Sequence, residues 1–419
     1  MKKIIGIVLM CLAVSWANAQ DLQMVNAFIS AQQYDKAKET LDKFFEKPAN
    51  ANNPEGWYYR AYIYNAQSRT KGMAIADANA LNHKSFDALK KYKELDPKEK
   101  FTKEENNQTL YNEYFSYYDL ALHSYNDKNY EMSFTNFKDA LEIHDYIYVN
   151  KYDGPKDLKM SALDTDVVWN LAILGNELKR NDDVFTYYKK LVDAGLRDEK
   201  YLEAYEGVAM YYKKNKDMGN LAVYIAKGKQ TFPKETFWED LDIQANTEGF
   251  TGADLFKKYD ELTVKYPNSY NVYYYYGADM LHYVYSDDSK NVNVTEYKTR
   301  LPELFKKALA IENTADVNMM LANFYYNNSF DLSDSSGRVK GTKPADVAKR
   351  NDLMAASQKS LEQCLPYAES AVATYSKAEK LKTADKNNYR LALDMLSEIW
   401  RVKKDPAKSK EYKDKKATI

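Results

Sequence analysis

The side chains that most often perform catalysis or hold metals are scattered along this sequence. No His-Glu-x-x-His zinc motif is present, and the histidines fall in separate segments, at His83, His123, His144 and His282. His144 precedes Asp145, and neighbouring residues of a helix point in different directions, so we expect these two side chains to diverge. The sequence therefore predicts no enzyme, no catalytic residues, no metal site and no cofactor.

Two further features could do chemistry but are better explained as structure. Cys364 lies between Leu361 and Leu365 without a nearby histidine, which predicts a buried structural thiol rather than a nucleophile. The carboxylates within residues 331–337 are spaced three apart and lack the alternating pattern and final glutamate of a calcium loop. We expect that segment, like residues 286–289, to be a solvated polar loop.

Composition narrows the class of protein. The chain has 419 residues, with 60 lysines and arginines against 61 aspartates and glutamates, so its formal charge is −1. That balance excludes a nucleic-acid binder that relies on a basic surface. Two cysteines exclude a disulfide framework, and only 14 glycines argue against glycine-rich phosphate loops. The 38 tyrosines and 14% aromatic residues indicate a folded chain.

The first nineteen residues have the pattern of a secretory signal. Lys2 and Lys3 precede an apolar stretch over residues 4–14, and Ala17-Asn18-Ala19 fits the small-x-small cleavage pattern. The stretch is too short to span a bilayer, which needs about 20 apolar residues. We expect cleavage after Ala19 and export to the periplasm, with outer-membrane association left open. Lipidation at Cys11 is an alternative, although Met10 fits the lipoprotein pattern poorly.

Helix-forming segments recur along the rest of the chain. Phe232-Pro233 and Tyr266-Pro267 end two apolar-periodic segments 34 residues apart. Residues 114–143 give the clearest example of what repeats. There, Tyr117, Leu120, Ala121 and Tyr125 follow helical spacing, residues 126–129 form a polar turn, and a second helical pattern carries Tyr130, Ser133, Phe137 and Ala140.

This arrangement resembles the tetratricopeptide repeat (TPR), a helix pair with small residues where the two helices approach closely. The first-helix pattern recurs at Trp57-x2-Arg60-Ala61-x2-Tyr64, Tyr205-x2-Val208-Ala209-x2-Tyr212, Tyr273-x2-Tyr276-Gly277-x2-Met280, Asn318-x2-Leu321-Ala322-x2-Tyr325 and Leu393-x2-Leu396-Ser397-x2-Trp400. The second-helix pattern recurs at Ala37-x3-Leu41-x2-Phe44, Val184-x3-Tyr188-x2-Leu191, Leu221-x3-Ile225-x2-Gly228, Leu255-x3-Tyr259-x2-Leu262 and Leu301-x3-Phe305-x2-Ala308. The resemblance covers nearly all of residues 21–416.

The resemblance implies an all-α fold, a superhelical α-solenoid of about nine TPR-like helix-pair repeats over residues 20–419. We expect repeats near residues 21–48, 54–97, 114–145, 165–195, 201–233, 236–267, 270–313, 315–381 with an insertion, and 388–416. Uneven spacing of the small residues predicts insertions near 66–84, 146–165, 284–299 and 328–346. A long helix over 347–380 is expected to be interrupted at Leu365-Pro366.

In a TPR superhelix the first helices line a concave groove. The positions three before, one after and four after each small residue are expected to face that groove, and many of them are aromatic here. The predicted groove residues are Tyr58, Tyr62, Tyr118, Tyr125, Trp169, Tyr274 and Tyr326. The other interpretation is that a tyrosine-rich chain simply packs these rings. Within the run Tyr273–Tyr276, helical geometry predicts two inward side chains, one in the groove and one outside.

Two functions remain as alternatives. The resemblance implies a non-enzymatic protein–protein interaction scaffold of a bacterial cell envelope, which binds a peptide or helix of another envelope protein. The composition and cleavage site are similar to those of exported Bacteroidota proteins. The alternative is an outer-membrane-associated carbohydrate-binding protein of the starch-utilisation type, because such proteins also combine TPR-like helices with aromatic platforms. Neither involves nucleic acid or a membrane span.

Overall fold

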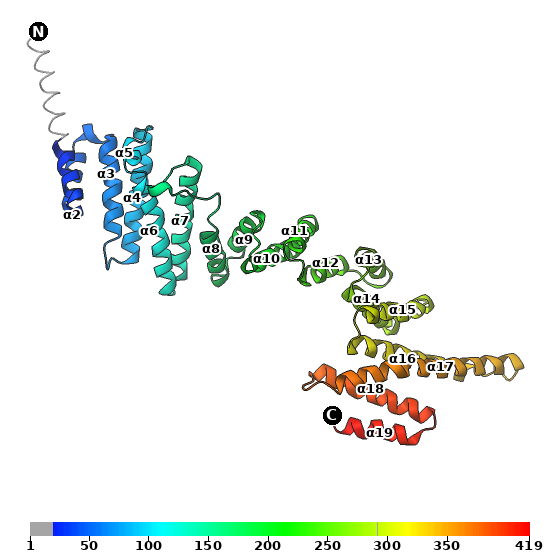
Figure 1. The fold of residues 1–419 in the computed structure, drawn as a ribbon. Coiled ribbons are helices and arrows are strands. Elements are labelled where there is room, and N and C mark those ends of the chain that lie inside the picture. The colour runs from blue at the N-terminus through cyan, green and yellow to red at the C-terminus, as the bar shows by residue number, and fades with distance from the viewer. Residues whose placement is uncertain (1–19, 291) are drawn as a thin grey trace, which may run out of the picture. The chain divides into compact units, whose positions relative to one another are not determined.

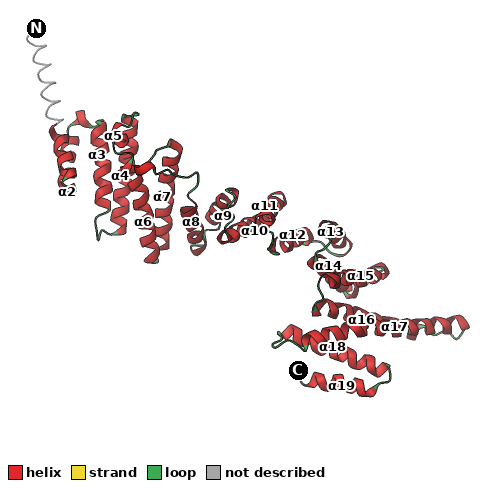
Figure 2. Cartoon of the chain, in the orientation of Figure 1, coloured by secondary structure: helices red, strands yellow, loops and turns green. Residues whose placement is uncertain are grey.

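The computed structural model describes residues 20–290 and 292–419, so the predicted signal peptide lies outside the described residues. Every regular element in these residues is a helix, and no strand is present among them (Figures 1 and 2). The chain divides into two compact units, Met1–Glu235 and Thr236–Ile419. No helix of the described residues is long and apolar enough to cross a membrane.

The first unit opens with a helical segment over residues 20–30. Its α-helices are α2 (Tyr34–Phe45), α3 (Pro54–Ser68), α4 (Ile75–Leu95), α5 (Lys100–Glu104), α6 (Gln108–Asn126), α7 (Tyr130–Asn150), α8 (Thr165–Glu177), α9 (Asn181–Asp193), α10 (Leu202–Lys214) and α11 (Met218–Thr231). Short 3₁₀ turns occur at η1 (Pro48–Asn50), η2 (Pro155–Asp157) and η3 (Glu199–Tyr201).

The second unit contains longer helices toward its C-terminal end. Its α-helices are α12 (Phe237–Thr247), α13 (Gly252–Lys265), α14 (Tyr270–Tyr285), α15 (Thr295–Ile311), α16 (Ala315–Arg338), α17 (Pro344–Tyr375), α18 (Thr383–Val402) and α19 (Pro406–Ala417). A 3₁₀ turn, η4 (Asp287–Ser289), follows α14.

Consecutive helices pack against each other as pairs within each unit. The described residues form nine pairs, namely 20–30 with α2, α3 with α4, α6 with α7, α8 with α9, α10 with α11, α12 with α13, α14 with α15, α16 with α17, and α18 with α19. This confirms the predicted fold class, an all-α solenoid of about nine helix pairs. No single pair buries its apolar side chains alone, so stacking of neighbouring pairs completes each core.

Many of the pairs turn through the same backbone motif. The N–H of Asn129 bonds to the carbonyl of Ser124 at 2.8 Å, and the N–H of Asp217 bonds to that of Tyr212 at 3.0 Å. Such a bond across five residues is typical of a helix end with a left-handed residue. That left-handed residue is not glycine in these turns but Gln32, Lys128, Lys179, Lys216 and Lys404. The next residue often caps the following helix, as Asn129 and Asp217 do with their side-chain oxygens.

Small residues allow the two helices of a pair to approach closely. A Cβ added to Gly277 of α14 would lie 2.5 Å from the ring of Phe305 on α15, so only glycine fits there. A second recurring device is a hydrogen bond from the second helix to the carbonyl of the small residue. Ser85 donates to Ala61 at 2.7 Å, Ser133 to Ala121 at 2.8 Å and Cys364 to Ala322 at 3.3 Å.

The expectation of a polar loop at residues 331–337 is wrong, because α16 continues through this segment to Arg338. Within the segment, Ser336 faces the next helix and donates to the carbonyl of Arg350 at 3.1 Å. Ser329, just before the segment, shares a hydrogen bond of 2.9 Å with Ser357. Small hydroxyl side chains thus bring α16 and α17 together along most of their length.

The expected interruption at Leu365-Pro366 is also absent, since α17 runs without a break from Pro344 to Tyr375. Pro366 is exposed, so the carbonyl that lacks its usual partner can turn toward water. Buried residues on either side of the proline, Cys364 and Ala368, hold α17 within the core of the second unit.

Candidate partner-binding surface

The four histidines and Cys364 lie on five different helices. Among the described residues, no group of three or more histidine, cysteine, aspartate or glutamate side chains is placed to hold a metal. Cys364 is buried as predicted, and burial raises the pKa of its thiol to about 12. The expectation that His144 and Asp145 diverge is wrong, because their side chains meet at 3.0 Å between Nδ1 and Oδ1. The exposed Asp145 carboxylate reaches back to the edge of a buried imidazole.

The sequence analysis did not identify one buried titratable residue. Glu113 of α6 is fully buried, and neither of its carboxyl oxygens has a hydrogen-bond partner among the described residues. Burial raises the pKa of this carboxyl to about 8, although nearby Ser85, Asn65 and the charge of Arg69 oppose the shift. The sequence did contain a signal, because Glu113 lies at helical spacing from buried Leu110 and Tyr117.

The predicted groove residues of α3 are mostly covered by the chain itself. Tyr58 is buried, and its ring stacks on Phe101 of α5 with centroids 5.4 Å apart. Glu105, just after α5, interacts with the Tyr58 hydroxyl. Tyr62 is half-buried and packs against the same apolar cluster. The segment between α4 and α6 therefore occupies this part of the predicted groove.

The predicted residues of α6 are more accessible. Tyr118 is half-buried, with its ring edge-on to Phe137 of α7 at 5.5 Å. Burial and the nearby charges of Asp166 and Asp164 raise the pKa of Tyr118, which places the ring beside the start of α8. Tyr125 lies near the end of the same helix and is 43% exposed.

Trp169 of α8 is held rigidly between two tyrosines. Its ring stacks on Tyr188 of α9 at 6.0 Å and meets Tyr201 edge-on at 5.5 Å. The Tyr188 hydroxyl in turn accepts from Asn176 at 2.9 Å and donates to Glu203 at 2.8 Å. The indole is thereby fixed in position by ring contacts from α9 and η3.

The two predicted residues of the second unit lie on separate helices. Tyr274 of α14 is half-buried and stacks on Tyr270 at 5.7 Å. Tyr326 of α16 meets Phe330 edge-on at 4.8 Å. Within the run at residues 273–276, Tyr273 and Tyr276 are buried, as expected for the two inward side chains, while Tyr274 is half-buried and Tyr275 is exposed.

Apolar side chains recur at the position after the buried alanine on α6, α8 and α10, the successive first helices of the first unit. Leu122 and Met210, at this position, are 39% and 45% exposed, and Tyr125 of α6 is 43% exposed. We name the set the first-helix surface, and it consists of Tyr118, Leu122, Tyr125, Trp169, Ile173 and Met210. Leu122, Ile173 and Met210 each follow the buried alanine of their helix by one residue.

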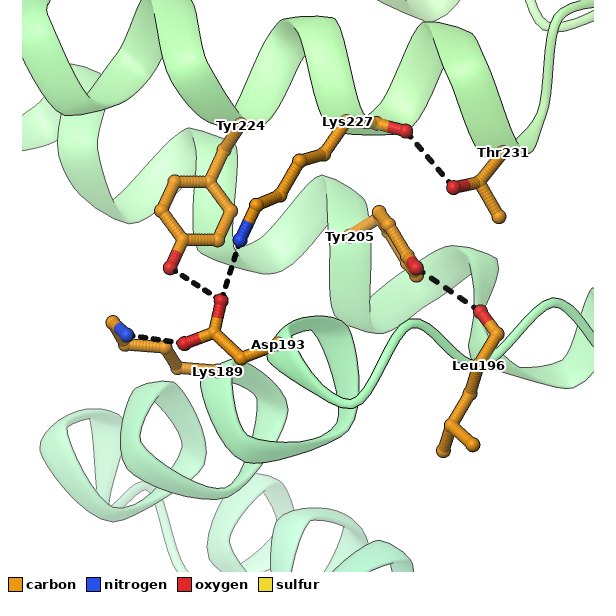
Figure 3. A network of polar contacts seen from close by, with 7 residues as sticks. All are labelled: Lys189, Asp193, Leu196, Tyr205, Tyr224, Lys227 and Thr231. Atoms are coloured by element: carbon orange, nitrogen blue, oxygen red, sulfur yellow. Dashed lines mark hydrogen bonds and ion pairs between the residues drawn. The ribbon is translucent and has the colours of Figure 1, made fainter.

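The second helices of the same unit are tied together by a polar network. Asp193 of α9 faces α11, where it accepts from Lys227 at 2.6 Å and from the Tyr224 hydroxyl at 2.9 Å (Figure 3). Lys189 donates to its other oxygen. Burial would raise the pKa of Asp193, but these donors lower it below the ordinary value. The network stabilises the stacking of neighbouring pairs.

Comparison with protein-family models and with curated proteins gave no match. Among solved structures, a monomeric mutant of IFIT1 with Gppp-AAAA is similar at 14% identity over 85% of this chain and 69% of that one, with a TM-score of 0.28. The TPR domain of P58(IPK) is similar at 12% identity over 91% and 99%, with a TM-score of 0.27. Cut9 in the Cut9–Hcn1 complex gives 12% over 94% and 85%, with a TM-score of 0.18. At these scores the likenesses support no conclusion about ligands.

Proposed function

We propose that this chain is a non-enzymatic scaffold that binds a segment of another protein on the first-helix surface of its first unit. The observation that carries the proposal is the recurrence of apolar side chains at one register of three successive first helices, where Leu122 and Met210 are exposed and Ile173 is half-buried. Apolar side chains that gather on a surface often mark a place where another molecule binds.

Rigidity of the aromatic residues favours the same proposal. Trp169 and Tyr118 are held by ring contacts to second helices, so a partner would order them at little cost in conformational entropy. Tryptophan and tyrosine are enriched among the residues that contribute most of the binding energy of protein interfaces. Leu122 and Met210 add exposed apolar area on α6 and α10.

The proposal includes an export route. Residues 1–19 are proposed to be a signal peptide, so that the mature chain acts in the periplasm of a Bacteroidota-like bacterium and its partner is another envelope protein. Intact mass measurement of the protein purified from its native cells tests this. We expect the mass of a chain that begins at Gln20 without lipid. A retained residue 1 or a lipid mass on Cys11 would contradict it.

Crosslinking in cells tests the binding surface. A tagged chain with Leu122→Ser, Tyr125→Ser and Met210→Ser changes three exposed side chains and should keep the melting temperature of the wild type. The matched control carries Val149→Ser and Val223→Ser on second helices of the same unit, where both valines are also exposed.

We expect one envelope protein to be captured in stoichiometric amounts by the wild type and the control but lost in the triple variant. Equal capture by all three chains, or no captured protein, would overturn the assignment of this surface. In that case binding of a glycan, the alternative that the sequence leaves open, would be measured next.

A further inference from the structure

Three successive first helices of the first unit carry an aromatic residue at the same position. Tyr58 of α3, Tyr118 of α6 and Trp169 of α8 each lie three residues before the buried alanine of their helix. Each also meets an aromatic ring of its own second helix. These second-helix rings are Tyr92 of α4 at 5.8 Å, Phe137 of α7 at 5.5 Å and Tyr188 of α9 at 6.0 Å. The three positions therefore have the same support and can be compared directly.

At two of these positions the chain places a further ring on the aromatic residue. Phe101, in the connection between α4 and α6, stacks on Tyr58 with the centroids 5.4 Å apart and the ring planes 18° apart. Tyr201, in the connection between α9 and α10, meets Trp169 edge-on at 5.5 Å. In both cases the ring comes from the connection that follows a second helix.

The contacts of Tyr118 are different. Among the described residues, the rings that meet it are Phe137 and, at 6.2 Å, Tyr114 of its own helix. The connection that follows α7, residues 151–164, contains one aromatic residue, Tyr152, and its ring lies 5.9 Å from a ring of α7 instead. This connection therefore supplies no ring to Tyr118, which stays half-buried.

Tyr118 also borders the exposed part of the first-helix surface. Leu122 and Tyr125 follow it by four and seven residues, so the three side chains share one face of α6. Leu122 and Tyr125 are 39% and 43% exposed. A half-buried tyrosine alone would not indicate a ligand, but the ring contacts that the chain makes on α3 and α8 are continuous in register with this position.

We propose that the partner segment supplies the third ring, an aromatic side chain seated on Tyr118 as Phe101 is seated on Tyr58. This inference rests on the proposed function and names the chemistry of the partner at one position. Aromatic rings in stacked or edge-on contact attract each other beyond the area that they bury. Because Phe137 already holds Tyr118, little conformational entropy is lost when the new ring binds. The contact at Tyr58 shows that a ring on a short helix fits this register.

Selection from a displayed library of random peptides tests the seated ring, because no natural partner needs to be known. The purified wild-type chain is compared with Tyr118→Leu, which keeps an apolar side chain against Phe137 but has no ring, and with Tyr118→Phe, which keeps the ring. The matched control is Tyr148→Leu, the same change at a tyrosine of α7 that is 44% exposed. Thermal unfolding of each variant shows whether it is folded.

We expect the peptides selected on the wild type to share an aromatic residue. The affinity of such a peptide should fall about tenfold on Tyr118→Leu and stay within about twofold on Tyr118→Phe and Tyr148→Leu. A peptide whose aromatic residue is replaced by benzoylphenylalanine, a photoreactive analogue, should crosslink to α6 of the wild type. This second measurement depends on contact and not on the stability of a variant.

The outcomes separate this inference from the proposed function. Peptides that share no aromatic residue but lose binding on the Leu122, Tyr125 and Met210 triple variant would overturn the seated ring and leave the scaffold intact. Equal affinity for the wild type and a folded Tyr118→Leu, or crosslinks confined to helices outside α6 to α8, would also overturn it. Peptides that bind the triple variant as well as the wild type, or a library that yields no binding peptide, would overturn the surface itself, and this inference with it.

Discussion

The same helix-pair architecture is filled in two different ways in the two units. Between α3, α4 and α6 of the first unit, the interior contains amides and a carboxyl, with Asn65, Asn82 and Glu113 nearly or fully buried. The core of the second unit is one apolar cluster that reaches from Ile243 to Ile399. Its buried hydroxyls along α16 and α17 donate to backbone carbonyls, as Ser360 does to Tyr325 at 2.8 Å.

This difference shows that the TPR-like pattern determines where the two helices of a pair approach each other. It does not determine which side chains lie between them. A buried amide or carboxyl without a full set of partners costs free energy that an apolar side chain would not. The free energy of unfolding of the second unit should therefore depend on the volume of its core side chains. That of the first unit should depend on pH, because its interior is polar.

The largest expected effect is on the apolar core of the second unit. Phe305 is fully buried against Gly277, so Phe305→Ala should leave a cavity and lower the free energy of unfolding by about 3–5 kcal/mol. Urea denaturation followed by circular dichroism measures this. The control is Phe330→Ala, the same change at a ring that is 51% exposed. Equal losses for the two variants would show that volume is not decisive in this core.

The next largest effect is the pH dependence that the buried carboxyl of Glu113 should give to the free energy of unfolding. Its folded-state pKa of about 8 lies above the ordinary value of 4.5 for a glutamate, so the folded chain holds a proton that the unfolded chain releases between these values. The free energy of unfolding should therefore fall as pH rises from about 4.5 to about 8. Glu113→Gln should remove this slope and stabilise the chain at pH ~8.5 by a few kcal/mol.

Urea midpoints at pH ~5 and pH ~8.5 measure the difference. Glu142→Gln on α7 is the control, because that side chain is 65% exposed and should leave the pH slope unchanged. If Glu113→Gln keeps the slope of the wild type, then the buried carboxyl is not its cause, and the contrast between the two interiors weakens.

A smaller effect tests what the two units share. Cys364 takes the place in the second unit that Ser85 and Ser133 take in the first, since each donates to the carbonyl of a small residue. Cys364→Ser should keep the hydrogen bond and change the free energy of unfolding by less than about 1 kcal/mol. Cys364→Val has a similar volume but no donor, so it should cost about 1 kcal/mol more. A Val variant as stable as the Ser variant would contradict the shared role.

The sequence predicted the repeating features better than the particular ones. Small residues and aromatic residues at helical spacing predicted the pairs, because each face of a pair must bury the same kind of side chain. The serines of α16 led to the wrong prediction of a loop, because a run of small polar residues is typical of a loop but also suits two helices that pack closely. The cover over Tyr58 could not be predicted, because it depends on where the segment around Phe101 folds back. Nor does spacing reveal that Glu113 lacks partners.

The smallest effect concerns a turn that occurs in both units. Lys216 in the first unit and Lys404 in the second adopt φ values of 58° and 61° between the helices of a pair. A side chain in this left-handed region costs about 1 kcal/mol or more, whereas glycine adopts it freely. Glycine also loses more entropy on folding, so Lys216→Gly and Lys404→Gly should each stabilise the chain by less than about 1 kcal/mol.

Thermal unfolding measures both, with Lys138→Gly inside α7 as a control that should lose about 1 kcal/mol. Gains of similar size at the two turns would show that the turn motif contributes equally in both units. The difference between the units would then lie only in what their helix pairs enclose.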